Sequence, residues 1–337
     1  MTKRALILGI GGQDASYLAD ILLEQGVEVH GMYRRSSTDN LSRIRHCRDK
    51  LHLHQGDMHD EGSVWRALEA ARDDMVDGDT FEIYNEADQD SVNWSFHTPS
   101  LNYDITFAAV GRLFELIRWH CPFAKVFQPC SAMMFGNATE CPQTETTPFN
   151  PQSPYACAKV GAFYLSKFYR DVHGLHITTG ILYNHDSPRR SEEYLLNKIC
   201  RSAVRIKRGL QKELLLGDLD QRVAIASARE CMDAVVRLLQ LPYASDYVIG
   251  SNNSCKIGSI VSYALTGSLA NFVDGMILGY EDRVKIDPKF SRPGKQQTLV
   301  ADHQKLSNAV KGWGTRFVTV LMDEIMADEE AKCALST

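Results

Sequence analysis

The sequence has no uninterrupted apolar stretch of about 18 residues, the length that a membrane-spanning helix needs. Its first four residues, Met-Thr-Lys-Arg, run directly into an apolar segment, so we expect no signal peptide and a cytoplasmic protein. The nine cysteines form no CxxC pair of the metal-binding kind, which predicts reduced thiols and no metal centre. Low-complexity segments and internal repeats are also missing.

The chain has no large excess of charge of either sign. A net charge of −5 gives no support for general nucleic-acid binding, and no sequence feature indicates a membrane partner. The hydrophobic fraction of 44% can fill a substantial core. A length of 337 residues is typical of a nucleotide-binding domain with a smaller second lobe.

A glycine-rich turn follows the first apolar run. Residues 5–8 read as a buried parallel strand and residues 17–25 as an amphipathic helix, with Gly-Ile-Gly-Gly-Gln-Asp-Ala between them. Gly9 permits a tight turn, Gly12 lets the backbone approach a pyrophosphate, and helix N–H groups can hold the anion. The context predicts a dinucleotide site rather than a purely structural turn. Its predicted cofactor-binding residues are Gly9, Gly12, Gln13 and Asp14.

The end of the second strand lacks the acidic residue that usually holds the ribose 2′-hydroxyl of NAD. Residues 27–32 read as this strand, and Tyr-Arg-Arg-Ser-Ser follows it. Guanidinium groups suit bidentate phosphate contacts, so Arg34 and Arg35 predict NADP, with a solvated basic loop as the alternative. Residues 51–58 read as a third strand that places Asp57 and Met58 against the adenine.

A tyrosine and a lysine, Tyr155 and Lys159, stand four residues apart in a helical segment and so share one helix face. An ammonium group near the phenol favours its ionised form, so we expect the pKa of Tyr155 to move from near 10 towards the working pH. A phenolate beside a nicotinamide ring can then take a hydroxyl proton. Alone, this spacing also fits an exposed tyrosine and a solvated lysine; the upstream glycine turn favours the functional interpretation.

Strand and helix patterns alternate to about residue 180. Strands are expected at 81–84, 125–127 and 177–182, and helices at 104–120 and 153–173. This rhythm predicts an α/β fold, a Rossmann-type doubly wound parallel sheet with a smaller C-terminal lobe. We expect an NADP-binding domain over 1–182 and a substrate lobe over 183–337, with some chain returning to the first domain. Residues 305–330 show helical periodicity.

Several segments together resemble GDP-mannose 4,6-dehydratases. They are residues 9–18, His-Gly-Met-Tyr-Arg-Arg-Ser-Ser (30–37), residues 146–156, Leu-Tyr-Asn-His-Asp-Ser-Pro-Arg-Arg (182–190) and Phe-Ser-Arg-Pro (290–293). The resemblance implies bound NADP, a GDP-sugar substrate and a homo-oligomer, either dimer or tetramer. It also implies a catalytic set of Ser131, Tyr155 and Lys159. The implied substrate-binding residues, for whose arginines a solvated surface is the alternative, are Asn184, Arg189, Arg190, Lys198 and Arg292.

The sequence departs from the family pattern at the position of an acid/base. Dehydration in the family uses the glutamate of a Ser/Thr-Ser-Glu-Leu-Tyr-Gly segment, and Met133 occupies that place here. A thioether cannot exchange protons, and general acid–base catalysis typically contributes about 10²–10⁴-fold. Dehydration is therefore expected to be impaired unless another group, for which Glu140 and Asp186 are candidates, takes this role.

Two further segments differ from the family. Its Asn-Leu-Gly-Ala-Gln-Ser-His-Val turn reads Asn-Glu-Ala-Asp-Gln-Asp-Ser-Val here (85–92), which brings three carboxylates towards the predicted pyrophosphate. Its Arg-Asp-Trp-Gly-His-Ala segment reads Val-Ala-Ile-Ala-Ser-Ala (223–228), leaving Arg222 as a substitute arginine.

These features leave three hypotheses open. The first is an enzyme that oxidises C4 of a GDP-hexose with NADP but does not dehydrate, such as an oxidoreductase or an epimerase. The second is a non-catalytic family member with a structural or regulatory role. The third is a working GDP-mannose 4,6-dehydratase with a displaced acid/base.

Overall fold

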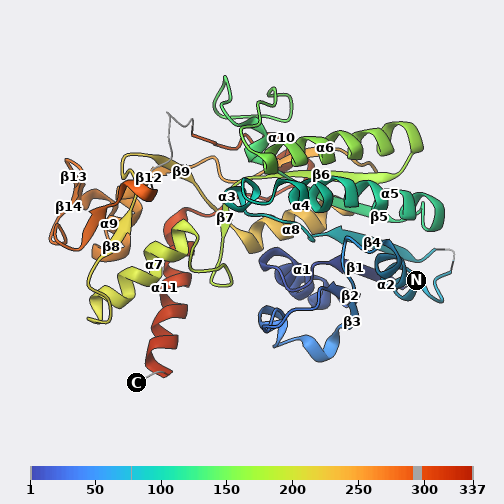
Figure 1. The fold of residues 1–337 in the computed structure, drawn as a ribbon, viewed down its shortest axis with the longest axis horizontal. Coiled ribbons are helices and arrows are strands. Elements are labelled where there is room, and N and C mark those ends of the chain that lie inside the picture. The colour runs from blue at the N-terminus through green and yellow to red at the C-terminus, as the bar shows by residue number, and fades with distance from the viewer. Residues whose placement is uncertain (1, 77, 291–297, 336–337) are drawn as a thin grey trace.

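The computed structural model describes residues 2–76, 78–290 and 298–335, and its centre is a parallel sheet of seven strands (Figure 1). The strand order is β3-β2-β1-β4-β5-β6-β11. The strands are β1 (Lys3–Leu8), β2 (Glu28–Tyr33), β3 (His52–Gln55), β4 (Thr80–Asn85), β5 (Lys125–Ser131), β6 (His176–Leu182) and β11 (Asp246–Ile249).

Strand β1 is an interior strand of this sheet, and its apolar residues are completely buried. Ala5 to Leu8 have no exposed surface, and β1 pairs in parallel with β2 on one side and β4 on the other. The strand order therefore reverses between β1 and β4, and such a reversal opens a crevice at the carboxyl ends of the strands. The predicted Rossmann-type doubly wound sheet is confirmed.

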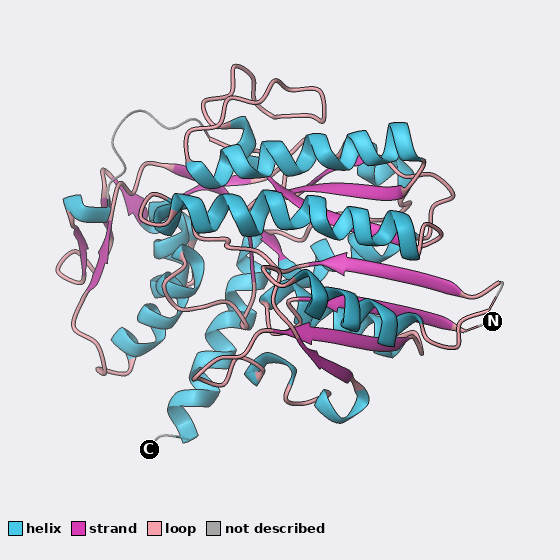
Figure 2. Ribbon diagram, turned by 45° about the vertical axis from the view of Figure 1, so that its right-hand side comes forward, coloured by secondary structure: helices cyan, strands magenta, loops and turns pink. Residues whose placement is uncertain are grey.

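Helices cover both faces of the sheet, as Figure 2 shows. Helices α1 (Gln13–Glu24) and α8 (Ala228–Leu239) pack against each other on one face. The other face carries α2 (Glu61–Arg72), α5 (Ala109–His120) and α6 (Pro154–His173). Two short helices, α3 (Val92–Ser95) and α4 (Pro99–Tyr103), precede α5, and the predicted helix 104–120 begins with a π-helical turn over 104–108.

Helix α6 has well-defined ends. The Ser153 hydroxyl accepts a hydrogen bond from the backbone N–H of Ala156, and Pro154 occupies the first turn, where its missing N–H costs nothing. Gly174 ends the helix in the left-handed conformation, at φ +70°. These caps fix where α6 begins, and so fix the direction in which the side chains of Tyr155 and Lys159 project from it.

The second lobe has its own core, formed by α7 (Leu195–Lys207), α9 (Ile257–Thr266) and α11 (Val318–Leu335). The predicted helical stretch 305–330 is divided between α10 (Gln304–Ala309) and α11. The short strands pair as β7 (His185–Asp186) with β10 (Ala226–Ser227), β8 (Leu214–Leu216) with β15 (Val284–Ile286), β9 (Arg222–Ala224) with β12 (Ser254–Lys256), and β13 (Phe272–Val273) with β14 (Met276–Ile277).

The second half of the chain also contributes to the first domain, because β11 pairs with β6 and α8 packs on α1. The division at residue 182 stays a prediction. Within the described ranges, none of the helices combines the length and the apolar character needed to cross a membrane.

Candidate active site

The fold brings together the three residues of the predicted catalytic set. Ser131 ends β5, and Tyr155 and Lys159 lie in the first turns of α6. The Nζ atom of Lys159 lies 5.7 Å from the centroid of the Tyr155 ring. Burial raises the pKa of the Tyr155 phenol, while Lys159 and the Ser131 side chain act to lower it. The arrangement can therefore support proton transfer at the phenol oxygen.

The protonation of Tyr155 differs from the expectation. Burial raises the pKa of this phenol, and the opposing charge of Lys159 is itself offset by the negative charge of Asp88. The net result is a pKa well above the ordinary value of 10.0. Lys159 lowers the pKa of Tyr155 as predicted, but the expectation that this pKa moves towards the working pH is wrong, because burial and Asp88 outweigh the ammonium charge.

Asp88 forms a buried ion pair with Lys159. The Lys159 Nζ donates to the backbone carbonyl of Pro129 at 2.8 Å and lies 2.7 Å from the Asp88 Oδ2. The other carboxylate oxygen accepts hydrogen bonds from the Thr106 hydroxyl at 2.5 Å and from the Gln89 N–H at 2.8 Å. Burial lowers the pKa of Lys159, but Asp88, followed by Tyr155 and Cys130, raises it above its ordinary value. The Lys159 ammonium group is therefore charged, and two of its hydrogen-bond donors are already used by Asp88 and Pro129.

Met133 stands where the family resemblance predicts a glutamate. Met133 lies in a 3-10 helix, Ala132–Phe135, that directly follows β5. Its backbone N–H donates to the Ser131 hydroxyl at 3.2 Å. The methionine side chain is half-buried and has no proton to exchange at physiological pH.

The two candidates for a displaced acid/base are engaged elsewhere. Glu140 is exposed and accepts a hydrogen bond from the Thr147 hydroxyl. Asp186 is buried, where it accepts from the Asn197 side chain at 2.5 Å and the Ser187 N–H at 2.8 Å. Burial raises the pKa of Asp186 to about 6.

The predicted glycine turn has the close contacts expected of it. Gly9 has φ +80°, and a Cβ there would lie 2.8 Å from the Glu86 carbonyl oxygen. Gly12 precedes α1 without a capping side chain, and its Cβ would lie 3.3 Å from the Gly9 carbonyl. The predicted cofactor residues Gln13 and Asp14 begin α1. The turn thus approaches the segment after β4 closely.

The sequence did not predict the contacts of two ionisable groups beside this turn, His185 and Glu86. His185 lies with its Nε2 2.7 Å from the Asp14 Oδ2. Burial raises the pKa of Asp14, but His185, Arg190 and Gln13 together lower it below its ordinary value. Burial of Glu86, followed by repulsion from Asp14, raises the pKa of Glu86 to about 8. Its Oε1 is buried and has no hydrogen-bond partner among the described residues. Glu86 is therefore largely neutral at physiological pH.

The two arginines after β2 line a cavity of about 580 Å³. Arg34 and Arg35 are exposed there, and Asp57 and a third arginine, Arg66, contribute to its wall. The remaining lining residues are Gln55, Gly56, Asp60 and Ser63. The side chain of Met58 is instead buried in the core beside α2.

The predicted substrate arginines have different surroundings. Arg189 forms an ion pair with Asp20 at 2.6 Å and lies 4.2 Å above the ring of Tyr17, so α1 already holds it. Arg190 lies 3.6 Å from the centroid of the Tyr194 ring and 3.5 Å from the Asp90 Oδ2. The Arg190 Nε is buried and finds no hydrogen-bond acceptor within the described ranges, so Arg190 is the better ligand candidate.

The other predicted substrate residues lie apart from one another. Lys198 lines a cavity of about 390 Å³ in the second lobe, where its Nζ lies 3.7 Å from the centroid of the Phe290 ring. Asn184 is exposed, and Arg292 lies outside the described residues. Arg222, the proposed substitute arginine, is exposed and donates to Ser254 at 3.1 Å.

Arg43 is a further residue that sequence reasoning missed. It donates to the backbone carbonyl of Arg189 at 2.7 Å and to that of Gly11 at 3.1 Å. Arg43 thereby ties the Pro-Arg-Arg loop to the glycine turn. A separation of 146 residues between Arg43 and Arg189 left no local sequence signal for this contact.

Comparisons with known structures show the same fold. UDP-glucose 4-epimerase from Brucella ovis, solved in complex with NAD, aligns with a TM-score of 0.78 at 17% identity, covering 97% of this chain and 98% of the epimerase. RMD from Pseudomonas aeruginosa, solved in complex with NADPH, aligns with a TM-score of 0.76 at 20% identity, covering 98% of this chain and 100% of RMD.

Sequence comparisons give the family. GDP-mannose 4,6 dehydratase 1 of Arabidopsis thaliana is 36% identical over 346 residues, covering 98% of this chain and 91% of the relative. The GDP-mannose 4,6-dehydratase of Sinorhizobium fredii is 35% identical over 332 residues, with 92% of each chain covered. The family model described as GDP-mannose 4,6 dehydratase matches residues 6–324. With its fold, its glycine turn and its Ser-Tyr-Lys set, this chain belongs to the GDP-mannose 4,6-dehydratase family.

Proposed function

We propose that this protein binds NADP and a GDP-hexose and oxidises the sugar at C4 without completing a dehydration. The observation that carries the proposal is the convergence of Ser131, Tyr155 and Lys159, beside a 3-10 helix in which Met133 replaces a carboxylate. Oxidation at a hydroxyl needs a proton acceptor, which Tyr155 supplies. Elimination of water needs a second acid/base, and Met133 cannot serve as one.

The residues present fit the adenosine end of NADP. Gly9 and Gly12 leave room for a pyrophosphate at the start of α1, and Arg34 and Arg35 supply guanidinium groups in an adjoining cavity. The third arginine of that cavity, Arg66, adds to its positive charge. When bound, the nicotinamide ring would accept the hydride from C4.

The roles of the site residues follow from their contacts. Tyr155 would take the proton of the C4 hydroxyl, and Ser131 would hold the phenol and the sugar hydroxyl through its own hydroxyl. Lys159 would stabilise the phenolate by its charge, provided that Asp88 releases it or is screened. Arg190 would meet the diphosphate with its buried, unpartnered Nε. Lys198 and the cavity around Phe290 would hold the guanosine part of the GDP-hexose.

A homo-oligomer, dimer or tetramer, is part of the proposal. Large apolar side chains are exposed on neighbouring helices of one face of the sheet: Leu101 on α4, Phe107 before α5, and Tyr164 and Phe168 on α6. A second copy of the chain could cover this face, since α4, the segment before α5 and α6 contact one another. Light scattering of wild type and of Phe168→Ser would test this.

One observation favours a second candidate, a non-catalytic member of the family. Asp88 both occupies Lys159 and raises the pKa of Tyr155, so the free protein has a protonated base and a neutralised cation. A protein in this state could bind nucleotides or partner subunits without turnover.

Turnover distinguishes these candidates. Purified protein would be incubated with GDP-mannose and NADP⁺, followed by the absorbance of the reduced nicotinamide and by product mass. We expect oxidation or epimerisation without loss of water, and its loss in Tyr155→Phe. The matched control is Tyr164→Phe, an exposed tyrosine on the same helix. Wild-type activity in Tyr155→Phe would exclude the oxidoreductase hypothesis, and nucleotide binding without turnover would favour the second candidate.

A further inference from the structure

Three imidazole rings and a carboxylate gather on the edge strand β3 and its neighbour β2. β2 contributes Glu28 and His30, and β3 contributes His52 and His54. The parallel register places His30 beside His52, so their side chains project from the same face, which they share with Glu28 two residues earlier on β2. Figure 1 shows β2 and β3 side by side at this end of the sheet.

The spacing of the ligand atoms suits a small transition-metal ion. The Glu28 Oε1 lies 3.1 Å from the His30 Nε2 and 3.9 Å from the His52 Nε2, and all three atoms lie within 4.8 Å of one another. With zinc–ligand bonds of about 2.0–2.2 Å, tetrahedral ligand atoms lie roughly 3.3 Å apart. Only small movements are needed to close the set around an ion.

His52 is the ligand that can make this movement. Its side chain is 60% exposed, whereas that of His30 is 6% exposed. The two rings are now stacked with 4.7 Å between centroids, so the exposed ring has to rotate for its lone pair to converge with that of His30. Solvent on the outer side of β3 leaves room for this rotation.

Two neighbouring groups support the arrangement. The Nδ1 of His30 is hydrogen-bonded to the Nε2 of His54 at 2.9 Å, which fixes the ring so that its Nε2 faces Glu28. The Arg4 Nε donates to the Glu28 Oε2 at 3.0 Å and leaves Oε1 for the ion. Metal-binding histidines commonly use their second nitrogen in this way, and such contacts orient the ligands.

We propose that Glu28, His30 and His52 bind a Zn²⁺ ion, with water at its fourth position. Imidazole nitrogens together with one carboxylate oxygen form a ligand set that Zn²⁺ accepts well. Glu28 and His52 begin their strands, whereas Ser131 ends the parallel strand β5. The ion would therefore lie at the amino ends of the strands, and Ser131 lies at the carboxyl ends. Its effect would be to fasten the edge strand β3 to β2. Sequence spacing gave no sign of it, because the ligands come from separate strands.

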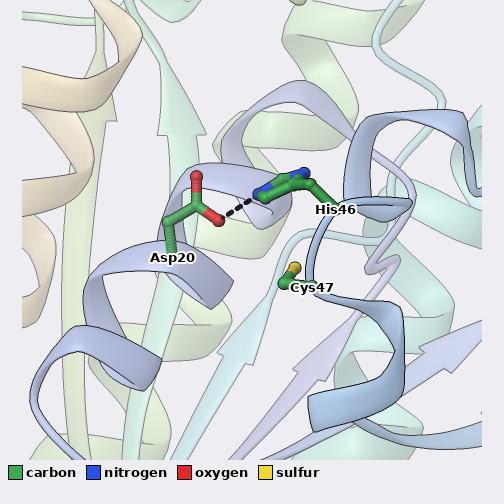
Figure 3. Close-up of side chains that lie close together, drawn as sticks. All are labelled: Asp20, His46 and Cys47. Carbon is green, nitrogen blue, oxygen red and sulfur yellow. Dashed lines mark hydrogen bonds and ion pairs between the residues drawn. The ribbon is translucent and has the colours of Figure 1, made fainter.

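A second cluster, Asp20, His46 and Cys47, is less suited to a metal (Figure 3). Asp20 lies 2.7 Å from the His46 Nε2 and 2.6 Å from the Arg189 guanidinium, much as Glu28 is paired with His30 and Arg4. The difference lies in the third ligand, because the Cys47 Sγ donates to the Ile44 carbonyl at 3.5 Å. Burial raises the pKa of the Cys47 thiol, whereas a metal needs the thiolate. His46 therefore provides a matched control for the proposed site.

The test is calorimetric titration of ZnCl₂ into the full chain after treatment with a chelator. We expect one Zn²⁺ per chain, with loss of measurable binding in His52→Asn and in Glu28→Gln. His54→Asn should weaken binding about 10–100-fold, the usual effect of removing a supporting contact. His46→Asn should bind as wild type does. Circular dichroism would verify that each variant is folded.

The outcomes separate the alternatives. Absence of saturable zinc binding by the wild-type protein overturns the proposal. So does unchanged affinity in both His52→Asn and Glu28→Gln. Loss of binding in His46→Asn with retention in His52→Asn would place the ion at the other cluster and equally overturn it. A rise in Tm on addition of Zn²⁺ that disappears in His52→Asn would support the proposed role of fastening the strands.

Discussion

Asp88 and Lys159 form an ion pair of 2.7 Å inside the candidate active site, where both side chains are largely buried. The family turn that residues 85–92 resemble has an alanine at the place of Asp88. An ammonium group has three donors, and here the Asp88 carboxylate and the Pro129 carbonyl use two of them. Asp88 thus both pairs with Lys159 and raises the pKa of Tyr155.

Asp88→Ala should increase hydride transfer from a GDP-sugar. The substitution removes a charge that raises the pKa of Tyr155, and it frees the Lys159 ammonium group. A pKa lowered by one unit corresponds to about tenfold more phenolate below the pKa, so we expect a rate increase of about tenfold or more. The pH–rate profile should also move to lower pH. Stopped-flow absorbance of the reduced nicotinamide at several pH values would measure both effects.

The same substitution should weaken the fold, because it leaves a buried lysine without its partner. Such losses typically cost about 3–5 kcal/mol, measured here as the free energy of unfolding in urea. Asp88→Asn, which keeps a side chain able to hydrogen-bond Thr106, should give the rate increase with a smaller loss of stability. Asp171→Asn, which changes an exposed carboxylate near the end of α6, is the control. A slower rate in both Asp88 variants would show that this carboxylate assists the chemistry instead.

NADP should bind more tightly than NAD, and Arg34→Ala together with Arg35→Ala should remove this difference. A phosphate held by charge-assisted hydrogen bonds contributes about 1.5–3 kcal/mol, which is roughly tenfold or more in affinity. Calorimetric titration of each dinucleotide measures the ratio. Arg45→Ala, an exposed arginine paired with Asp39, is the matched control. Equal affinities in the wild type, or a preference for NAD, would contradict the assignment.

Local sequence patterns predicted much of this fold. The glycine turn and the capped helix α6 depend on residues next to one another in the chain, and the structure has both where expected. The predicted third strand (51–58) is shorter, covering only His52–Gln55, because the backbone at Gly56 and Asp57 turns towards α2 through hydrogen bonds with Tyr33 and Ser63.

The contacts that set the chemistry could not be predicted in the same way. Asp88 was expected near the pyrophosphate, yet its carboxylate forms an ion pair with Lys159. The sequence could not show this, because α6 and the segment after β4 meet only in the folded chain. His185 and Asp14 are 171 residues apart. The pKa of Tyr155 depends on burial, which no spacing of two residues reveals.

Glu86 should make the protein less stable as the pH rises. Burial and the charge of Asp14 raise the pKa of Glu86 from 4.5 to about 8, so the folded state keeps a proton that the unfolded state has lost. Stability therefore falls between about pH 4.5 and 8. Glu86→Gln should remove this fall, a gain on the order of 1–3 kcal/mol at pH 8 relative to pH 5. Urea unfolding at both pH values, with exposed Glu69→Gln as control, would measure it.

If the wild-type protein does not dehydrate its substrate, as proposed, Met133→Glu should restore part of this reaction. The substitution places a carboxylate directly after β5, beside Ser131, at the position of the family glutamate. Recovery of an acid/base can contribute about 10²–10⁴-fold, but the new carboxylate still needs partners that orient it, so we expect the lower end of this range. Met133→Gln, of the same size and without an acid, should remain inactive. The measurement is the mass of the product from GDP-mannose, which decreases by one water on dehydration. Rapid dehydration by the unmodified protein would contradict the proposal and point to Asp186 or Glu140 as the acid/base.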